Sequence, residues 1–289
     1  MRAASKQATS KRTFEPGPVV VVGSRDKAEV AKALDEIHDR LERDFGIAAI
    51  DLDGDLDLSR VDARWLLLFG GDGAMLAASR RMGDNQLPTL AVNFGRLGFL
   101  TEVEFRTIGQ ALDRIAAGKV YVRERQRLST EMGDWSYDAL NDVVAHSAQR
   151  GRLFRISAAI EGREALRYAG DGVIVSTPTG STAYSLAAGG PILDPELEAI
   201  VITPLAAHAL SQRPLVISAD QTVELYIKGD DPPGQITVDG QVQRHFDATH
   251  RLQVRKADHP FLLIRVGLRS HYTRLRRILG WGGRPKGSA

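Results

Sequence analysis

Residues 64–82, RWLLLFGGDGAMLAASRRM, have the pattern of a buried strand, a glycine-rich turn and a helix. Arg64–Phe69 is a continuous apolar run, which is typical of a strand covered on both faces of a parallel sheet. Gly70–Gly73 interrupts this run, and Ala74–Met82 then favours a helix. Strand, turn and helix in this order form the repeating unit of an α/β fold.

Similar units lie on both sides of that stretch. Pro18–Gly23 (PVVVVG) is a short run rich in β-branched residues, and Asp26–Asp44 carries an apolar stripe at helical spacing. Ile47–Leu52 is a second candidate strand, Asp51–Asp57 a polar loop, and Thr89–Phe94 (TLAVNF) a further strand. The alternation over the first hundred residues predicts a parallel α/β sheet.

The pattern changes after a helix predicted at Thr107–Ala117, which Gly118 ends. Short segments separated by Gly, Asp or Pro follow, and they predict an all-β, antiparallel domain. These segments are Arg125–Met132, Asp138–Ala145, Phe154–Glu161, Val173–Ser176, Leu215–Ser218, Val223–Ile227, Gln235–Val238 and Leu252–Arg255. We therefore expect a basic N-terminus over 1–16, an α/β domain over 17–110, an all-β domain over 111–260, and a last strand with a basic tail over 261–289.

The composition is that of a globular protein without cysteine. Of the 289 residues, 43% are hydrophobic and 26% are charged, so each half can bury a core. The lack of cysteine excludes disulfides, thiolate catalysis and Cys-ligated zinc or iron–sulfur centres. No apolar run approaches the ~20 residues of a membrane span, and residues 1–12 lack the apolar region of a secretory signal. We expect a cytoplasmic protein with no membrane association.

The net charge of +2 conceals two basic ends. Residues 1–12 and 265–289 contain Lys and Arg but no acidic residue, whereas 13–264 is acidic overall. Such ends could contact nucleic acid, acidic lipid or an anionic substrate, but we interpret them as solvated tails. No nucleic-acid-binding motif accompanies the charge, so no nucleic-acid partner is expected.

The motif Gly70-Gly71-Asp72-Gly73 lies where an open α/β sheet binds its ligands, at the carboxyl end of a strand. Glycines there let backbone N–H groups approach a phosphate, and the start of the next helix favours negative charge. Asp72 would repel phosphate, so it indicates metal binding or proton removal. The alternative is that Asp72 caps the helix. The motif is not G-x-G-x-x-G, which disfavours an ordinary dehydrogenase.

Two weaker motifs also follow or interrupt strands. Asn93–Leu100 (NFGRLGFL) would form a loop beside the first one if the two strands are neighbours, and otherwise is a glycine-rich turn. Asn141-Asp142 could reach a ligand from a strand end, where a carboxylate beside an amide suits ribose hydroxyls. The alternative for this pair is a polar turn.

The most specific stretch is residues 170–191, GDGVIVSTPTGSTAYSLAAGGP. A strand runs into a turn rich in hydroxyl groups and then into a short helix. Hydroxyls and free N–H groups at a helix start can bind an anion or a polar ligand. A solvated Ser/Thr loop is the alternative, but such loops rarely alternate hydroxyls with small apolar residues after a buried strand.

These four stretches together resemble the NAD kinase family, over residues 18 to about 281. The resemblance implies transfer of the ATP γ-phosphate to the 2′-hydroxyl of the adenosine ribose of NAD, giving NADP. It implies a Rossmann-like domain, a β-sandwich-like domain and a last segment that returns to the first domain. It also implies a divalent cation, Mg²⁺ in the first instance although the metal ligands are unknown, and a homodimer or homotetramer.

The resemblance also assigns roles to residues. It implies that Asp72 accepts the proton, that Asn141 and Asp142 hold ribose hydroxyls in place of an Asn-Glu pair, and that Asp171 contacts the nicotinamide end. Two residues before Asp171, where the family often has Arg or Lys, this chain has Ala169. His208 matches a family histidine. The remaining nucleotide-binding candidates are Gly70, Gly71, Gly73, Asn93, Arg152, Thr182, Ala183, Tyr184, Ser185, Leu186, Ala187 and Gln241.

The sequence leaves three other functions open. GGDG also occurs in lipid kinases, which would require an apolar membrane-facing surface. A non-catalytic nucleotide-binding regulator would have lost Asp72, which is present. A nucleic-acid binder would use the basic ends and show a steep salt dependence.

Overall fold

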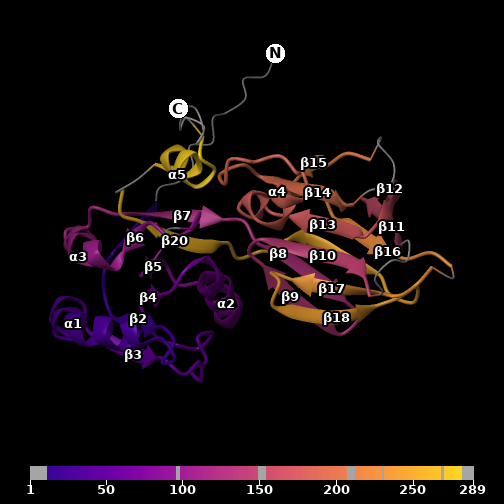
Figure 1. The fold of residues 1–289 in the computed structure, drawn as a ribbon. Helices are drawn as coiled ribbons and strands as arrows, with labels where there is room; N and C mark the ends of the chain where they lie inside the picture. Colours follow the sequence, from indigo (N-terminus) through magenta and orange to yellow (C-terminus); the bar gives the residue numbers. More distant parts are fainter. Residues whose placement is uncertain are drawn as a thin grey trace, which may run out of the picture. The chain divides into compact units, whose positions relative to one another are not determined.

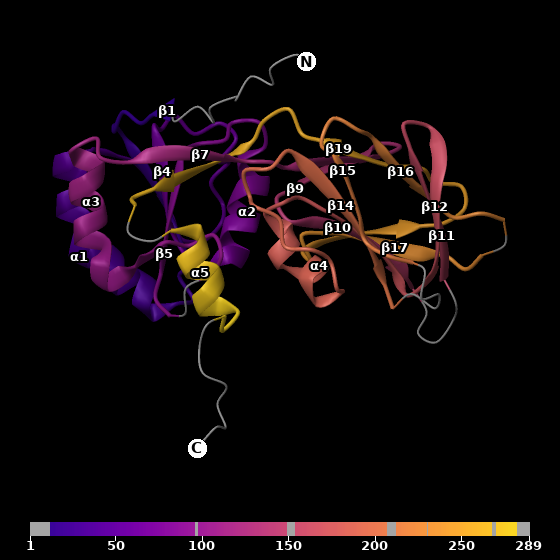
Figure 2. The ribbon, with the colours of Figure 1, turned by 90° about the horizontal axis from the view of Figure 1, so that it is seen from above.

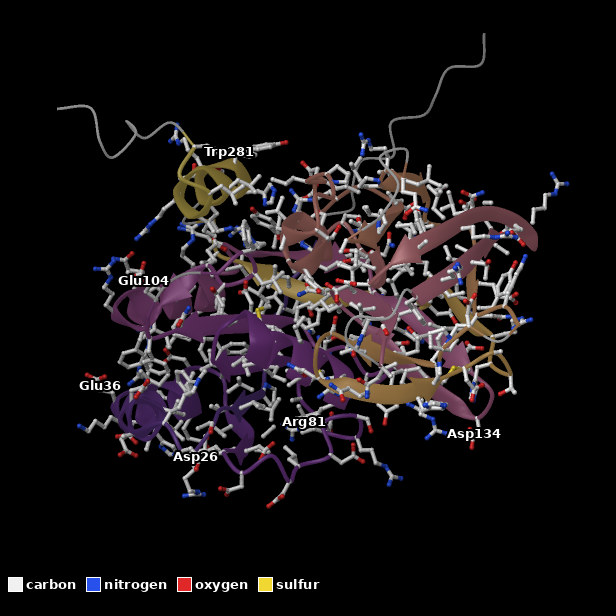
Figure 3. All side chains as sticks on the ribbon, turned by 45° about the vertical axis from the view of Figure 1, so that its right-hand side comes forward. Asp26, Glu36, Arg81, Glu104, Asp134 and Trp281 are labelled. Atoms are coloured by element: carbon white, nitrogen blue, oxygen red, sulfur yellow. The ribbon has the colours of Figure 1, made fainter. Side chains whose placement is uncertain are left out.

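The structure, a computed structural model, describes residues 12–95, 98–148, 154–206, 212–229, 231–267 and 270–281 (Figures 1 and 2). Its internal contacts divide the chain into two units. Unit 1 comprises residues up to Arg123 together with those from Leu262 onward, and unit 2 comprises Glu124–Phe261. Charged side chains such as those of Glu36 and Asp134 are exposed (Figure 3).

Unit 1 contains an eight-stranded sheet in the order β1-β7-β20-β5-β4-β2-β3, with β6 beside β5. Its central pairs β2–β3, β2–β4 and β4–β5 are parallel, as the buried apolar runs predicted. The strands are β1 (Arg12–Thr13), β2 (Val19–Val22), β3 (Ile47–Asp51), β4 (Trp65–Phe69), β5 (Thr89–Asn93), β6 (Val103–Glu104), β7 (Tyr121–Arg125) and β20 (Phe261–Arg265).

Helices of unit 1 cover this sheet. The helices α1 and α3 bury one apolar stripe each in the same cluster as Trp65, Leu67 and Phe69 of β4. The stripe of α1 (Val30, Leu34, Ile37, Leu41) has the spacing that the sequence predicted. The helices are α1 (Ala28–Asp44), α2 (Asp72–Met82), the 3₁₀ turn η1 (Phe105–Thr107), α3 (Ile108–Ala116) and α5 (His271–Ile278). None of the helices in the described ranges is both long and apolar enough to cross a bilayer.

Unit 2 contains two six-stranded antiparallel sheets, in the orders β15-β14-β13-β10-β17-β18 and β12-β11-β16-β19-β8-β9. Apolar residues from both sheets form one core, so the sheets pack face to face. The strands are β8 (Leu128–Met132), β9 (Trp135–Ala139), β10 (Asp142–Ser147), β11 (Phe154–Ile160), β12 (Arg163–Gly170), β13 (Gly172–Ser176), β14 (Ala199–Leu205), β15 (Leu215–Ser218), β16 (Val223–Tyr226), β17 (Gly234–Val238), β18 (Val242–Phe246) and β19 (Leu252–Lys256). Two short helices, η2 (Gly180–Thr182) and α4 (Tyr184–Ala187), follow β13.

Strand periodicity separates the core of unit 2 from its outer surface. Along β10, Val143 and Ala145 point into the core between the sheets, whereas Val144 belongs to a smaller apolar cluster with Ile174 and Leu205. Successive side chains of a strand point to opposite faces, so Asp142, Val144 and His146 share the outer face. This face carries the cavity described below.

Several predicted elements need correction. The segments Asp138–Ala145 and Arg125–Met132, each predicted as one strand, are both broken in the structure. β9 ends at Ala139 and β10 begins at Asp142, and β7 ends at Arg125 before β8 begins at Leu128. The strands β1, β6, β12, β14 and β18 were not predicted. The first division between units lies at Arg123/Glu124, not near residue 110, because β7 pairs with β1.

Candidate functional site

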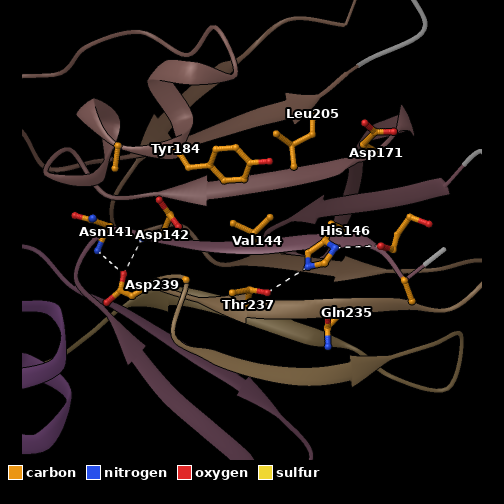
Figure 4. Close-up of a pocket in the computed structure, with 14 residues that line it drawn as sticks. Asn141, Asp142, Val144, His146, Asp171, Tyr184, Leu205, Gln235, Thr237 and Asp239 are labelled. Carbon is orange, nitrogen blue, oxygen red and sulfur yellow. Dashed lines mark hydrogen bonds between the residues drawn. The ribbon is translucent and has the colours of Figure 1, made fainter. Parts of the chain in front are cut away.

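Unit 2 contains a cavity of about 850 Å³ on the outer face of the β10 sheet (Figure 4). The cavity is lined by strand residues, by the end of the β17–β18 turn and by the segment after β13. Its lining residues are Asn141, Asp142, Val144, His146, Ser147, Ala148, Asp171, Ala183, Tyr184, Leu205, Gln235, Thr237, Asp239 and Gly240. A pocket of this size with a few converging polar groups is suited to a small-molecule ligand.

The carboxylate of Asp239 fixes the turn that presents Asn141 and Asp142. It accepts the backbone N–H groups of Leu140 at 2.9 Å, Asn141 at 2.8 Å and Asp142 at 3.1 Å. Asp239 has φ +50°, in the left-handed region that only a few non-glycine residues occupy. The turn is therefore held from the β17–β18 turn, far away in sequence.

Asp142 presents a buried carboxyl group to this cavity. The residue is 5% exposed and is the first residue of β10. The pKa of Asp142 is raised to about 7, mainly by burial and to a smaller extent by the negative charge of Asp239. Both effects penalise the ionised form, so this carboxyl can both donate and accept hydrogen bonds near neutral pH. Such a group can bind the hydroxyls of a sugar.

Hydroxyl groups of the stretch after β13 hold the same turn from its other side. Thr177 Oγ1 donates to the Leu140 carbonyl at 2.7 Å, and Ser176 Oγ donates to the Asn141 carbonyl at 3.2 Å. A Cβ on Gly180 would lie 2.1 Å from the Asn141 oxygen, so only glycine allows this approach. Hydroxyl groups of the stretch 170–191 thus help to build the site itself.

The segment Thr182–Ala187 divides between the cavity and the interior. Ala183 and Tyr184 line the cavity, and Tyr184 is 51% exposed. Ser185 is fully buried, and its Oγ lies 2.9 Å from Thr203 Oγ1. Thr182 Oγ1 donates to the Thr179 carbonyl at 3.2 Å. Of the side chains in this segment, that of Tyr184 offers a ligand the largest accessible surface.

The end of the cavity opposite Asn141 is also polar, and the sequence analysis predicted only one of its residues, Asp171. His146 Nε2 lies 3.2 Å from Thr237 Oγ1, and His146 Nδ1 lies 3.1 Å from the carbonyl oxygen of Ser147. Gln235 lines this end, as does Asp171 from the turn before β13 (Figure 4). Alternation along two strands could have identified these residues, because His146 and Val144 follow Asp142 at steps of two, and Thr237 and Gln235 precede Asp239 likewise.

In unit 1, Asp72 is held by the loop that follows β5. Its carboxylate accepts the backbone N–H groups of Phe99 at 2.8 Å, Leu100 at 3.2 Å and Thr101 at 3.3 Å. The N-cap residue of α2 is Gly71, and no side chain makes a capping hydrogen bond at this end of the helix. The alternative that Asp72 caps α2 is therefore wrong. Asp72 instead joins the two glycine-containing loops.

The two loops are neighbours, as expected if β4 and β5 are adjacent. The N–H of Gly70 donates to Val92 O at 2.9 Å, and a Cβ on Gly71 would lie 3.9 Å from Asn93 Nδ2. Gly73 has open space where a Cβ would stand. Asn93 Oδ1 accepts the N–H of Gly95 at 3.0 Å and so shapes its own loop.

The predicted site residues therefore fall into separate groups. Asn141, Asp142, Asp171, Ala183 and Tyr184 meet at the cavity of unit 2. Gly70, Gly71, Asp72, Gly73 and Asn93 gather at the ends of β4 and β5 in unit 1. Thr182, Ser185, Leu186, Ala187 and Gln241 do not line the cavity, whereas Asp239 and Gly240, just before Gln241, do. Arg152 and His208 lie outside the described residues.

The described residues offer no ready metal site. Among them, no group of three or more His, Asp or Glu side chains is arranged to hold a metal ion. Mg²⁺ is commonly bound by one or two carboxylates together with substrate phosphates, so a site of that kind would be completed by the substrate.

Comparison with protein-family profiles gives two matches. The ATP-NAD kinase N-terminal domain matches residues 52–120, and the ATP-NAD kinase C-terminal domain matches residues 140–266. A protein of Gemmatimonas aurantiaca named NAD kinase is 43% identical over 226 residues, which cover 75% of this chain and 78% of the relative. A protein of the same name from Rhodopirellula baltica is 34% identical over 280 residues, covering 93% and 88%.

Solved structures show the same fold. The yeast NADH kinase complexed with NADH superposes with a TM-score of 0.81 at 22% identity, over 95% of this chain and 91% of that one. An Archaeoglobus fulgidus NAD kinase in complex with ATP gives a TM-score of 0.75 at 24% identity, over 91% and 98%.

Proposed function

The chain belongs to the NAD kinase family, and we propose that it binds NAD in the cavity of unit 2. It transfers the γ-phosphate of ATP to the 2′-hydroxyl of the adenosine ribose of NAD, and the product is NADP. The matches to NAD kinases do not favour a lipid kinase or a non-catalytic regulator. The proposal for the site is carried by one observation: the buried Asp142 carboxyl and the adjacent Asn141 line a cavity of about 850 Å³.

The polar groups of this cavity suit the nucleoside parts of NAD. Asn141 and Asp142 offer amide and carboxyl groups to ribose hydroxyls, and Tyr184 offers an exposed aromatic ring to a base. Gln235, Thr237 and His146 offer donors and acceptors at the other end. We propose that Asp171 and Gly240 contact the ligand from the cavity wall, with Gln241, Thr182, Leu186 and Ala187 at its margin.

We propose that Asp72 is the general base. Its oxygens accept three backbone N–H groups, two on Oδ1 and one on Oδ2, and these donors fix the position of the carboxylate. A carboxylate has about four lone-pair sites, so Oδ2 can still accept a hydrogen bond from a ribose hydroxyl. The glycines around Asp72 leave room for that hydroxyl, and Gly70, Gly71, Gly73 and Asn93 complete the loop ends that would face the phosphates.

Measurement of kcat and NAD affinity for Asp72→Asn tests this role. Loss of a general base typically lowers the rate about 10²–10⁴-fold, while Asn keeps the size and can still bond a hydroxyl. We expect kcat to fall by that factor and NAD affinity to change much less. Asp84→Asn, on the exposed turn after α2, is the control for removing one charge. A folded Asp72→Asn protein with near-normal kcat would remove Asp72 from the chemical step.

We propose that a divalent cation, Mg²⁺ in the first instance, arrives with the ATP phosphates, because the described residues form no cage of their own. We also propose a cytoplasmic homodimer or homotetramer, on the basis of family resemblance alone. Light scattering coupled to gel filtration measures the assembly, and a monomer at assay concentration would contradict it.

A further inference from the structure

A second carboxylate anchors the loop that holds Asp72. Glu102 directly follows the three residues whose N–H groups bind the Asp72 carboxylate. Its Oε2 lies 3.2 Å from Arg265 Nε in an ion pair and accepts the backbone N–H of Val266 at 3.1 Å. The loop 98–102 is therefore fixed at one end by the start of α2 and at the other by the end of β20.

This second anchor is a buried ion pair. The side chain of Glu102 is 2% exposed and that of Arg265 is 5% exposed. Taking two charges out of water is costly, and a buried pair of this kind adds little stability compared with apolar residues of the same volume. Its presence therefore calls for a role in geometry, because an ion pair with defined donors fixes the position of the chain more narrowly than apolar packing does.

The loop between the two anchors allows little displacement. Thr101 is fully buried, and its Oγ1 accepts the N–H of Gly98 at 2.9 Å. A Cβ on Gly98 would lie 2.2 Å from Asp72 Oδ1, so the loop backbone is in close contact with the carboxylate. A shift at Glu102 would move the N–H groups of residues 99–101 relative to Asp72.

We propose that Glu102 and Arg265 are positioning residues, which fix the Asp72 carboxylate in its reactive orientation through the loop 98–102. The proposal rests on the function of Asp72 given above. Through Arg265, β20 would then position Asp72 in addition to pairing in parallel with β5 at Leu263 and Thr89. Arg265, from the last strand of the chain, thus helps to set the position of the Asp72 carboxylate.

Glu102→Gln is the primary variant, because the amide keeps the size and an acceptor for Val266 but removes the charge. A misplaced reactive group costs one to two orders of magnitude in rate, so kcat should fall about ten- to hundredfold. The KM for NAD should stay within about twofold, because the cavity of unit 2 is built by other residues. Arg265→Lys is a milder second variant, because it keeps the positive charge, and it can be used if Glu102→Gln folds poorly. It should retain more of the wild-type kcat than Glu102→Gln does.

Hydrogen exchange of the intact, ligand-free protein tests the loop itself. Peptides covering residues 98–102 should exchange at least tenfold faster in Glu102→Gln than in the wild type. The matched control is Asp51→Asn, which breaks another ion pair in unit 1, between the buried Asp51 carboxylate and the partly buried Arg81 in the last turn of α2. This control should lose thermal stability without changing the exchange of 98–102 or the kcat of the folded protein. Unchanged exchange in Glu102→Gln would overturn the proposal.

A double-mutant cycle with Asp72→Asn separates this inference from the proposed function. If Glu102 acts through Asp72, adding Glu102→Gln to Asp72→Asn should lower kcat by no more than about twofold. Fully additive losses would show that Glu102 acts by another route and would overturn the proposal. If Asp72→Asn alone kept the wild-type kcat, the proposed role of Asp72 as general base would fail. Faster exchange in Glu102→Gln would then show that Glu102 anchors the loop without affecting catalysis. That outcome would also overturn the positioning role.

Discussion

The carboxylate of Asp239 accepts the backbone N–H of Asp142 at 3.1 Å and also raises the pKa of the Asp142 carboxyl. One residue therefore fixes the backbone of its neighbour and disfavours the charge on that neighbour's side chain. Burial of Asp142 acts in the same direction and is the larger cause. The outcome is a carboxyl group that is held in place at the cavity and changes charge near neutral pH.

This relationship predicts an unusual dependence of stability on pH. The pKa of Asp142 rises from 3.8 to about 7 on folding, so between these values the folded protein retains a proton that the unfolded chain releases. The folded state then binds more protons, and the contribution of Asp142 to the free energy of unfolding falls as pH rises. The loss is complete above about pH 7.

Asp142→Asn should remove that contribution. The variant should equal the wild type in stability near pH 4 and exceed it near pH 8 by a few kcal/mol, on the order of 1.4 kcal/mol per pKa unit. Denaturant unfolding at both pH values measures the difference. Asp134→Asn, at an exposed turn, controls for the loss of one negative charge. Parallel pH curves for Asp142→Asn and the wild type would contradict the burial argument.

Gly98→Ala should impair catalysis by displacing Asp72. The added methyl group would stand 2.2–2.4 Å from the Asp72 carboxyl atoms, which real Cβ contacts do not allow. Either the loop or the carboxylate must shift, and we expect kcat to fall by at least about tenfold. Gly95→Ala is the control in the same loop, because nothing lies within 4 Å of its Cβ position. Equal kcat values for the two variants would show that the close approach is unimportant.

Tyr184 should bind the substrate and take no part in the chemical step. Its ring is half exposed in the cavity, so Tyr184→Ala removes both an aromatic surface and a hydroxyl. One hydrogen bond is worth about 0.5–1.5 kcal/mol, so Tyr184→Phe should raise the KM for NAD about two- to tenfold, and Tyr184→Ala should raise it further. Steady-state kinetics separate KM from kcat. A collapse of kcat at unchanged NAD affinity would indicate a chemical role.

Ser185 should affect stability more than binding. Its hydroxyl is fully buried beside Thr203 Oγ1, and Ser185→Ala would leave that partner without its hydrogen bond. The cost should be about 1–3 kcal/mol of unfolding free energy, with a KM for NAD within about twofold of the wild type. Thermal or denaturant unfolding together with kinetics decides the matter. A large rise in KM without a stability loss would instead indicate direct ligand contact.

Local patterns in the sequence were sufficient to predict much of the architecture. Apolar runs such as Trp65–Phe69 and the stripe of α1 predict buried strands and a covering helix, because burial and periodicity are properties of neighbouring residues. The change to short alternating segments predicted the antiparallel unit. The same patterns failed at Leu140 and Asn141, where distant contacts with Asp239, Ser176 and Thr177 bend the chain between two strands.

The class of each unit, the glycine loops and the family can be read from the amino-acid sequence, since these depend on residue types at short spacing. Which polar groups meet depends on how the chain folds in three dimensions. The fold places Asp239 under the Asn141–Asp142 turn, turns the Ser185 hydroxyl into the interior, and brings Arg265 from the end of the chain to Glu102. The physical reason is that hydrogen bonds and ion pairs act over about 3 Å in space, whereas the residues that form them lie as far apart in sequence as residues 102 and 265.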